Sequence, residues 1–133
     1  MVKTRIFLVD DHEALLHELR HALKSEFRIV GVAGSGEALL LEAPKVSPQV
    51  IVLDVSLPGM SGIQAAEQLK SIMPEVKIVM LSMHADSAYA IAALDAGASA
   101  YVVKSSGVSE LAKAIREVQA GFEYVPPSSS KTS

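Results

Sequence analysis

Residues 50–62, with the sequence VIVLDVSLPGMSG, decide the fold. The run 50–53 is continuously apolar rather than alternating, which predicts a strand buried on both faces, as in a parallel sheet. This strand ends at Asp54, and Pro58 with Gly59 marks a turn before the next helical pattern, which continues to about residue 73. The stretch is therefore a strand–loop–helix unit with a carboxylate at the carboxyl end of its strand.

The same unit recurs along the chain. We expect strands over 6–9, 28–33, 50–53, 76–81 and 100–103, and helices over about 12–25, 37–44, from the end of the 56–62 loop to 73, 87–96 and 108–120. Strands that alternate with helices indicate an α/β fold with a parallel sheet and right-handed crossovers. We predict a flavodoxin-like (βα)5 doubly wound five-stranded parallel sheet with helices on both faces. Its order, 2-1-3-4-5, is adopted from the commoner doubly wound fold of this size.

Length and composition restrict the class of protein. The chain has 133 residues, of which 50% are hydrophobic and 20% charged, so it has material for one buried core. Its net charge of −3 argues against nucleic-acid binding by this chain itself. It has no cysteine, which excludes disulfides, thiolate metal centres and cysteine nucleophiles. The apolar runs are too short to cross a membrane. We expect a soluble, cytoplasmic domain without membrane contact.

The end of the chain differs in composition. Residues 126–133, PPSSSKTS, are typical of a linker or disordered tail. We therefore expect one domain over residues 3–125, followed by this tail.

Polar residues stand at the ends of four of the five predicted strands: Asp10 and Asp11, Asp54, Ser82 and Lys104. In open parallel sheets, ligands bind beyond the carboxyl ends of the strands, where the strand order reverses. The predicted order makes the first and third strands neighbours at that point. We therefore expect the three carboxylates in one pocket, with the hydroxyl and the ammonium on its far side.

The chemistry of this set points to phosphoryl transfer. Three carboxylates in close proximity repel one another unless a cation lies between them. Oxygen ligands of this kind suit Mg2+, which keeps waters and recruits phosphate oxygens. The ammonium group can pair with a phosphoryl group, and the hydroxyl can donate to it. The residues thus predict a phosphoryl-acceptor site with a carboxylate nucleophile.

Over about residues 3–125 the chain resembles the receiver domain of a bacterial two-component response regulator. The similarity rests on segments 7–12 (FLVDDH), 52–62 (VLDVSLPGMSG), 80–82 (MLS) and 100–104 (AYVVK), which occur in order at four strand ends. Segment 92–101 (AALDAGASAY) is similar to the subfamily whose receivers precede a LuxR-type helix-turn-helix DNA-binding domain, a domain absent from this chain. Ser105 stands where many receivers have a proline, which leaves the peptide isomer after Lys104 open.

The resemblance implies a role for each residue of the set. Asp54 is the phosphoacceptor. Mg2+ is held by Asp10, Asp11, Asp54 and the backbone carbonyl of Ser56. Lys104 binds the phosphoryl group, and Ser82 moves to form a hydrogen bond with it.

The resemblance also implies a switch and its partners. Tyr101 changes rotamer and couples the site to the face formed by the fourth helix, fifth strand and fifth helix. A sensor histidine kinase donates the phosphoryl group, and the output is transcription through the missing domain. A homodimer on phosphorylation is compatible with this, while the sequence leaves the dimer surface open. From their positions beside the pocket, we hypothesise that Ser56 and His84 influence the lifetime of the phosphoryl group.

Two other functions remain compatible with the sequence. One is a receiver-like interaction module that is never phosphorylated. The other is a Mg2+-dependent aspartyl-phosphate phosphatase of similar fold, which would need an acid/base carboxylate two residues after the nucleophile, where Ser56 stands. We favour a switch that phosphorylates and slowly dephosphorylates itself over a turnover enzyme.

Residues 17–21, HELRH, match the zinc-peptidase pattern H-E-x-x-H. On a helical wheel, the buried stripe of this helix is predicted to be Leu15, Leu19, Ala22 and Leu23. The two histidines, His17 and His21, then face solvent on the opposite side. We therefore expect a solvated helix face and no zinc site.

Overall fold

The computed structural model describes residues 2–84 and 87–125. The chain alternates between strands and helices: β1 (Arg5–Val9), α1 (Glu13–Leu23), β2 (Arg28–Ala33), α2 (Gly36–Val46), β3 (Val50–Asp54), α3 (Gly62–Ile72), β4 (Lys77–Ser82), α4 (Ser87–Asp95), β5 (Ala100–Val103), a 3-10 turn (Lys104–Ser106) and α5 (Val108–Gln119). The tail predicted over 126–133 lies outside the described residues.

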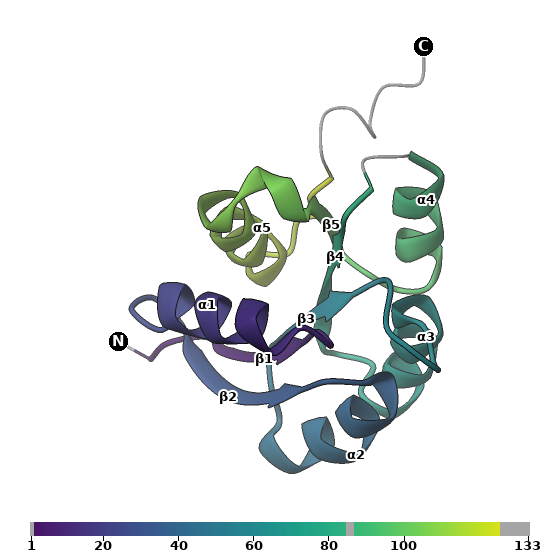
Figure 1. Ribbon diagram of the computed structural model, residues 1–133, viewed down its shortest axis with the longest axis horizontal. Helices are drawn as coiled ribbons and strands as arrows, with labels where there is room; N and C mark the ends of the chain where they lie inside the picture. The colour runs from purple at the N-terminus through teal and green to yellow at the C-terminus, as the bar shows by residue number, and fades with distance from the viewer. Residues whose placement is uncertain (1, 85–86, 126–133) are drawn as a thin grey trace.

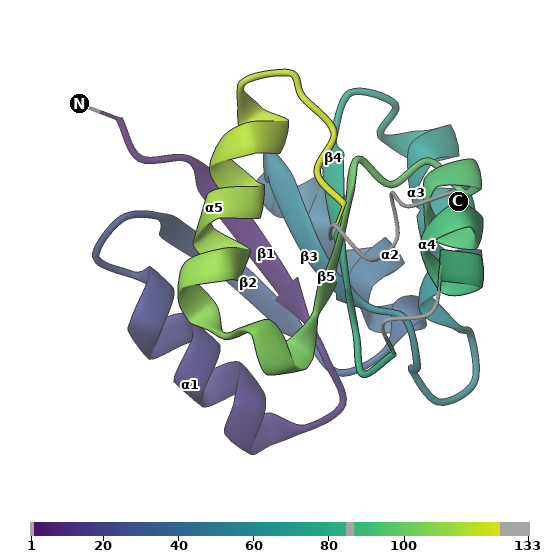
Figure 2. The ribbon, with the colours of Figure 1, turned by 90° about the horizontal axis from the view of Figure 1, so that it is seen from above.

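The five strands form one parallel sheet in the order β2-β1-β3-β4-β5. Helices α1 and α5 cover one face, and α2, α3 and α4 cover the other (Figures 1 and 2). The predicted flavodoxin-like fold and strand order are therefore confirmed.

Two hydrophobic cores lie on the two faces of the sheet. On β1, Ile6 and Leu8 join the core under α1 and α5, whereas Phe7 and Val9 join the core under the other three helices. Successive side chains of a strand point to opposite faces, so an unbroken apolar run supplies both cores. This pattern explains why the strands are continuous in hydrophobicity.

Two local expectations need correction. Helix α2 does not end at Pro44 but continues to Val46. Proline lacks the N–H for one helical hydrogen bond, but its fixed φ is compatible with a helix. On α1, Ala22 is exposed rather than buried. The buried stripe is narrower than predicted and contains Leu19 and Leu23.

The free edge of β5 is covered by the chain that follows α5. Tyr124 forms a parallel bridge with Ala100, and its carbonyl accepts the N–H of Tyr101 at 2.9 Å. This pairing satisfies backbone groups that an edge strand would otherwise present to solvent. Across the described residues, no helix combines the length and the apolar character needed to cross a membrane.

Candidate functional site

The predicted site residues meet at the carboxyl edge of the sheet. Asp10 follows β1, Asp54 and Ser82 are the last residues of β3 and β4, and Lys104 follows β5. Asp10, Asp54 and Ser82 are only 1%, 2% and 1% exposed. Because parallel strands all end at this edge, residues far apart in sequence become neighbours there.

Three short turns hold the polar side chains at these strand ends. The N–H of His12 donates to Asp10 Oδ1 at 3.0 Å, and the N–H of Ser56 donates to Asp54 Oδ1 at 3.1 Å. In the same way, the N–H of His84 donates to Ser82 Oγ at 3.0 Å. Each side chain therefore accepts a hydrogen bond from the backbone two residues ahead, which fixes its orientation.

The loop after Asp54 needs its glycines. Gly59 has a φ of 71°, in the left-handed region that favours glycine. Gly62 packs so closely on the backbone carbonyl of Asp54 that a Cβ there would collide with it. Ser61 then caps α3, since its hydroxyl accepts the N–H of Gln64 while the Gln64 side chain accepts the N–H of Ser61. These contacts account for the two glycines and the serine of the LPGMSG segment.

Lys104 joins the two buried carboxylates. Its Nζ lies 3.0 Å from Asp10 Oδ2 and 3.3 Å from Asp54 Oδ2, and its side chain is only 14% exposed. The contact with Asp10 Oδ2 is an ion pair without hydrogen-bond geometry, so this buried oxygen has no hydrogen-bond donor within the described part of the chain. A buried carboxylate oxygen without a hydrogen-bond donor is suited to bind a metal ion.

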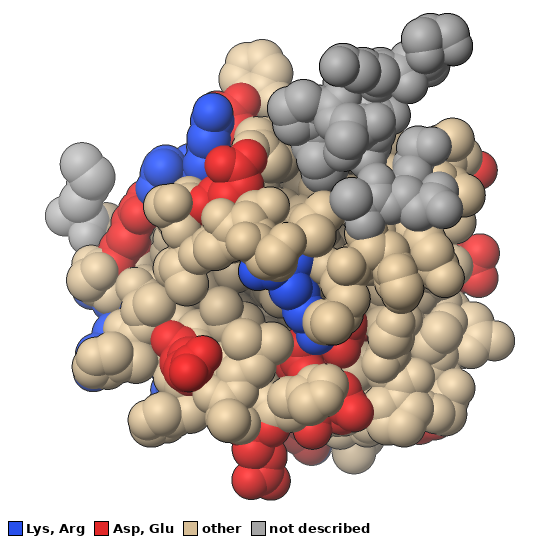
Figure 3. Space-filling view, turned by 45° about the horizontal axis from the view of Figure 1, so that its top comes forward, with Lys and Arg blue, Asp and Glu red and all other residues tan. Residues whose placement is uncertain are grey.

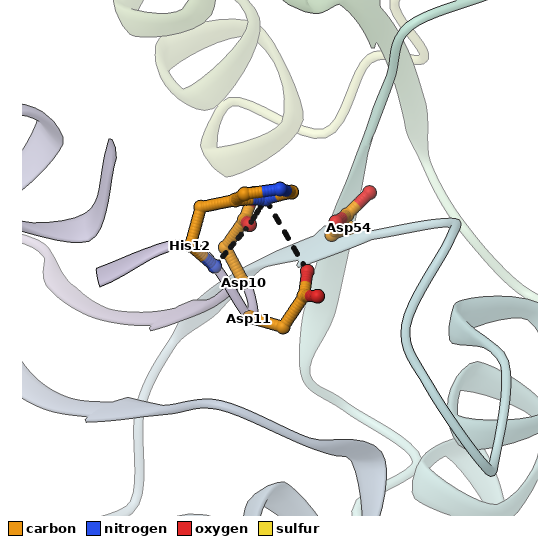
Figure 4. Close-up of side chains that lie close together, drawn as sticks. All are labelled: Asp10, Asp11, His12 and Asp54. Carbon is orange, nitrogen blue, oxygen red and sulfur yellow. Dashed lines mark hydrogen bonds and ion pairs between the residues drawn. The ribbon is translucent and has the colours of Figure 1, made fainter. Parts of the chain in front are cut away.

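The acidic cluster has the donors for a divalent cation. One ligand atom from each of Asp10, Asp11, His12 and Asp54 lies within 4.8 Å of the others. Figure 4 shows the three carboxylates and the imidazole converging on one small volume. Carboxylate oxygens with open positions beside them fit Mg2+.

Sequence reasoning did not assign His12 to the site. Its Nδ1 lies 2.9 Å from Asp10 Oδ1 and 3.3 Å from Asp11 Oδ1, which places the ring on the open side of the acidic cluster (Figure 4). These contacts raise the pKa of His12, chiefly through the hydrogen bond with Asp10. Its position directly after two aspartates was the available signal.

Burial disfavours the charged form of Asp54, Asp10 and Lys104, and neighbouring groups oppose or add to this effect on each pKa. Burial raises the pKa of Asp54, and the charge of Asp10 adds to this, so the Ser56 N–H and Lys104 only partly offset the rise. Burial also pulls the pKa of Asp10 upward, but hydrogen bonds from His12 and the charge of Lys104 outweigh it and lower the pKa. Burial opposes the charged form of Lys104, yet the two aspartates raise its pKa overall.

A second group of residues links the pocket to β5. Tyr101 is fully buried, and its hydroxyl donates to the backbone carbonyl of His84 at 2.6 Å. The N–H of that residue is bound to Ser82, so Ser82 and Tyr101 hold the same peptide segment from its two sides. The imidazole of His84 stacks on Tyr89 of α4, with ring centroids 4.8 Å apart.

The remaining predicted residues are placed as follows. Ser56 is exposed at the rim and contacts Asp54 through its N–H. Residues Lys104–Ser106 form a 3-10 turn, and the described residues contain no cis peptide bond, which answers the question raised by Ser105. His17 and His21 are exposed on α1, as the helical wheel predicts, and His17 lines a pocket that also contains Asp10 and Asp11.

The family model that describes the response regulator receiver domain matches residues 6–116 of this chain. The chain belongs to the response regulator receiver family. Receiver domains are signalling switches rather than turnover enzymes. In this receiver domain, the acidic pocket stands at the strand ends where the sequence motifs predict it.

Similar proteins extend this assignment. The receiver domain is 34% identical over 125 residues to the response regulator GacA of Pseudomonas protegens, covering 92% of this chain and 59% of that protein. It is 40% identical over 119 residues to the DNA-binding transcriptional activator DevR/DosR of Mycobacterium tuberculosis, covering 88% of this chain and 55% of that protein. The chain thus spans somewhat more than half the length of these relatives.

Solved structures agree in fold. A LuxR-family two-component response regulator from Aurantimonas superposes with a TM-score of 0.92 and is 32% identical, covering 96% of this chain and 93% of that chain. The isolated receiver domain of RcsB from Salmonella enterica serovar Typhimurium, determined with the phosphomimetic BeF3−, gives a TM-score of 0.86 at 28% identity, with 96% of both chains covered. These relatives belong to the subfamily that the sequence predicted.

Proposed function

We propose that this receiver domain accepts a phosphoryl group on Asp54 from a sensor histidine kinase and changes conformation in response. The observation that carries the proposal is the buried Asp54 carboxylate, which lies 3.3 Å from the Lys104 ammonium and within the acidic cluster. A buried carboxylate held beside a cation is suited to accept a phosphoryl group.

The proposed transfer uses Asp54 as nucleophile. A carboxylate oxygen attacks the phosphorus of the donor phosphohistidine, an O–P bond forms, the N–P bond breaks, and the imidazole of the kinase leaves with the electron pair. Lys104 neutralises charge on the phosphoryl oxygens. Asp10, Asp11, Asp54 and the backbone carbonyl of Ser56 would hold Mg2+, which would supply further charge neutralisation.

The proposed switch begins at Ser82. Its hydroxyl accepts the N–H of His84, and donation to a phosphoryl oxygen would draw the hydroxyl toward Asp54. Because Tyr101 is bound to the carbonyl of His84, a shift of this segment reaches β5 and α4. The phosphoryl group thereby favours one of two conformations through its different contacts in each.

The output and the boundaries belong to the same proposal. We assign residues 3–125 to the receiver domain and 126–133 to a linker. We propose that the output is transcription through a LuxR-type DNA-binding domain, and that phosphorylation promotes homodimers. Support comes from the relatives, one described as a DNA-binding transcriptional activator and another solved as RcsB dimers bound to DNA. Ser56 and His84 remain candidates for control of the phosphoryl lifetime.

Intact mass spectrometry tests the proposal. The wild type and Asp54→Asn are incubated with a small phosphodonor, with Mg2+ or with a chelator. We expect a single phosphoryl adduct that requires Mg2+, is lost in Asp54→Asn and decays slowly. Continuous donor hydrolysis with many turnovers would indicate a phosphatase. An unchanged adduct in Asp54→Asn would refute the phosphoacceptor assignment.

A further inference from the structure

A second polar surface lies at the opposite, amino edge of the sheet. Here α1 ends and β1 and β2 begin, around a concavity of about 710 Å³ that we call the amino-edge concavity. Its lining consists of five basic residues and three apolar ones: Lys3, Arg5, Arg20, Lys24, Arg28, Val2, Phe27 and Ile29. Arg5 begins β1 and Asp10 follows its end, so the two lie at opposite ends of this strand. Arg20 also lines the neighbouring pocket that contains Asp10 and Asp11.

The cations of this concavity lack acidic partners. Its lining contains no aspartate or glutamate, and none of its five basic side chains forms an ion pair within residues 2–84 and 87–125. Glu26 lies nearby in sequence, but both of its carboxylate oxygens accept hydrogen bonds from Arg116. On the face shown in Figure 3, by contrast, basic and acidic side chains are interspersed.

Two of the arginines are held together by the sheet itself. Arg5 and Arg28 are register partners on the parallel strands β1 and β2. Like charges on neighbouring strands repel one another and reduce stability. Lys24 and Arg20, near the carboxyl end of α1, also interact favourably with the helix dipole, but this explanation does not extend to the strand pair. A bound anion would reduce the repulsion between Arg5 and Arg28.

Intramolecular bonds hold part of the cationic lining in place. Lys3 Nζ donates to the backbone carbonyl of Lys24 at 3.1 Å, and Arg5 Nε donates to the carbonyl of Ser47 at 3.0 Å. Each group keeps further N–H donors for a ligand, since an ammonium has three and a guanidinium five. Positioned donors lose less entropy when a ligand binds.

We propose that the amino-edge concavity binds a compact polyphosphate anion, either free or as the tail of a nucleotide. The volume lies within the roughly 300–1,000 Å³ of small-molecule sites. A phosphate chain concentrates several negative charges in such a volume, and guanidinium groups match phosphate oxygens in pairs. The chain as a whole carries a charge of −3, which opposes the approach of a long polyanion such as DNA.

Titration calorimetry in chelator-containing buffer tests this proposal with tripolyphosphate, ATP, orthophosphate, a short DNA duplex and hexaglutamate. We expect tripolyphosphate to bind more tightly than orthophosphate, DNA or the peptide, with affinity that falls as salt is added. Equal binding of ATP and tripolyphosphate would point to the phosphate chain alone. Tighter binding of ATP would point to a nucleotide, with its base against the apolar residues.

Matched variants locate the site. Arg20→Gln/Arg28→Gln should weaken tripolyphosphate binding by roughly tenfold per arginine, as should Lys3→Gln/Lys24→Gln to a smaller extent. The control Lys45→Gln/Lys113→Gln removes the same charge outside the concavity and should bind as the wild type does. Amide NMR shifts should move in residues 2–5 and 20–29 and not around the acidic cluster.

Several results would overturn the proposal. They are the absence of tripolyphosphate binding, tighter binding of DNA or hexaglutamate, equal loss in the control variant, or NMR shifts confined to the acidic cluster. Thermal unfolding of each variant verifies that it is folded. Because these measurements need neither Mg2+ nor phosphorylation, they are independent of the proposed switch.

Discussion

The two edges of the sheet differ in how their charged side chains are partnered. At the carboxyl edge, buried carboxylates of Asp10 and Asp54 share one ammonium, and almost every polar group has a partner. At the amino edge, Arg5 and Arg28 face each other across two strands without an acidic neighbour in the lining. The first arrangement buries two carboxylates beside one cation, whereas the second is largely exposed and of one sign. Together, the two proposals would give this sheet two anion-binding surfaces, one at each edge.

The largest expected effect concerns the ammonium at the carboxyl edge. Lys104→Met keeps much of the side-chain volume but leaves the phosphoryl oxygens without their cation. We expect the rate of Asp54 phosphorylation to fall by roughly 100-fold or more, because preorganised charge stabilisation is lost. The adduct is followed by intact mass over time. Lys45→Met is the control, and an equal loss in that exposed variant would contradict the assigned role.

The next prediction concerns the stability of a variant that lacks the proposed phosphoacceptor at the same edge. Burial and Asp10 raise the pKa of Asp54, so its charged form is disfavoured in the folded state. Asp54→Asn should therefore increase the free energy of unfolding at neutral pH by about 1 kcal/mol. The gain should disappear at low pH, where Asp54 is protonated in both the folded and the unfolded protein. Urea unfolding at several pH values measures this, and a less stable variant at neutral pH would contradict the expectation.

The next prediction concerns the stability gained when Mg2+ binds at the carboxyl edge. If the acidic cluster binds Mg2+, saturating Mg2+ should stabilise the wild type by about 2–3 kcal/mol at a concentration 100 times Kd. Asp11→Asn removes one ligand without opening a buried cavity and should reduce this increase. Melting temperatures with Mg2+ and with a chelator report the difference. A melting temperature independent of Mg2+ would argue against the site.

A smaller effect is expected when the hydrogen bond that links β5 to the pocket is removed. Tyr101→Phe removes the hydroxyl that donates to the His84 carbonyl at 2.6 Å but keeps the ring. The lost hydrogen bond should reduce the free energy of unfolding by about 1 kcal/mol. Phosphorylation should still occur, while the dimerisation that follows it should weaken. Tyr89→Phe, which alters a half-exposed ring on α4, is the control for stability.

The smallest effect belongs to the amino edge. Arg28→Gln relieves repulsion with Arg5 and should raise the free energy of unfolding by a few tenths of a kcal/mol at low salt. The gain should vanish in about 1 M salt, where the screening length is only about 3 Å. Lys45→Gln lacks such a neighbour and should show no gain. A salt-independent gain would mean that repulsion is not its cause.

Much of the carboxyl edge was predictable because its signals are local. Each site residue stands directly at the end of an apolar run, and parallel strands end at one edge. With the strand order assumed, Asp10, Asp54, Ser82 and Lys104 could therefore be placed together. His12 was missed because its ring reaches the site only through the turn that its own N–H forms with Asp10. Nothing in the alternation of apolar and polar residues predicts that turn.

Other features depend on contacts between distant segments. The hydrogen bond from Tyr101 to His84 and the pairing of Tyr124 with β5 need the folded arrangement of β4, β5 and the chain after α5. The exposure of Ala22 likewise depends on how α1 packs on the sheet, which a helical wheel does not specify.

By itself, the sequence determined the α/β class, the strand positions and the set of residues at the carboxyl edge, because hydrophobic period and strand ends are local properties of the chain. The strand order was a correct assumption rather than a deduction. Only the tertiary structure decided that Lys104 bridges Asp10 and Asp54, and that five of the basic residues of an acidic protein gather in one concavity. The physical reason is that charge density depends on separation in space, which packing sets and sequence spacing does not.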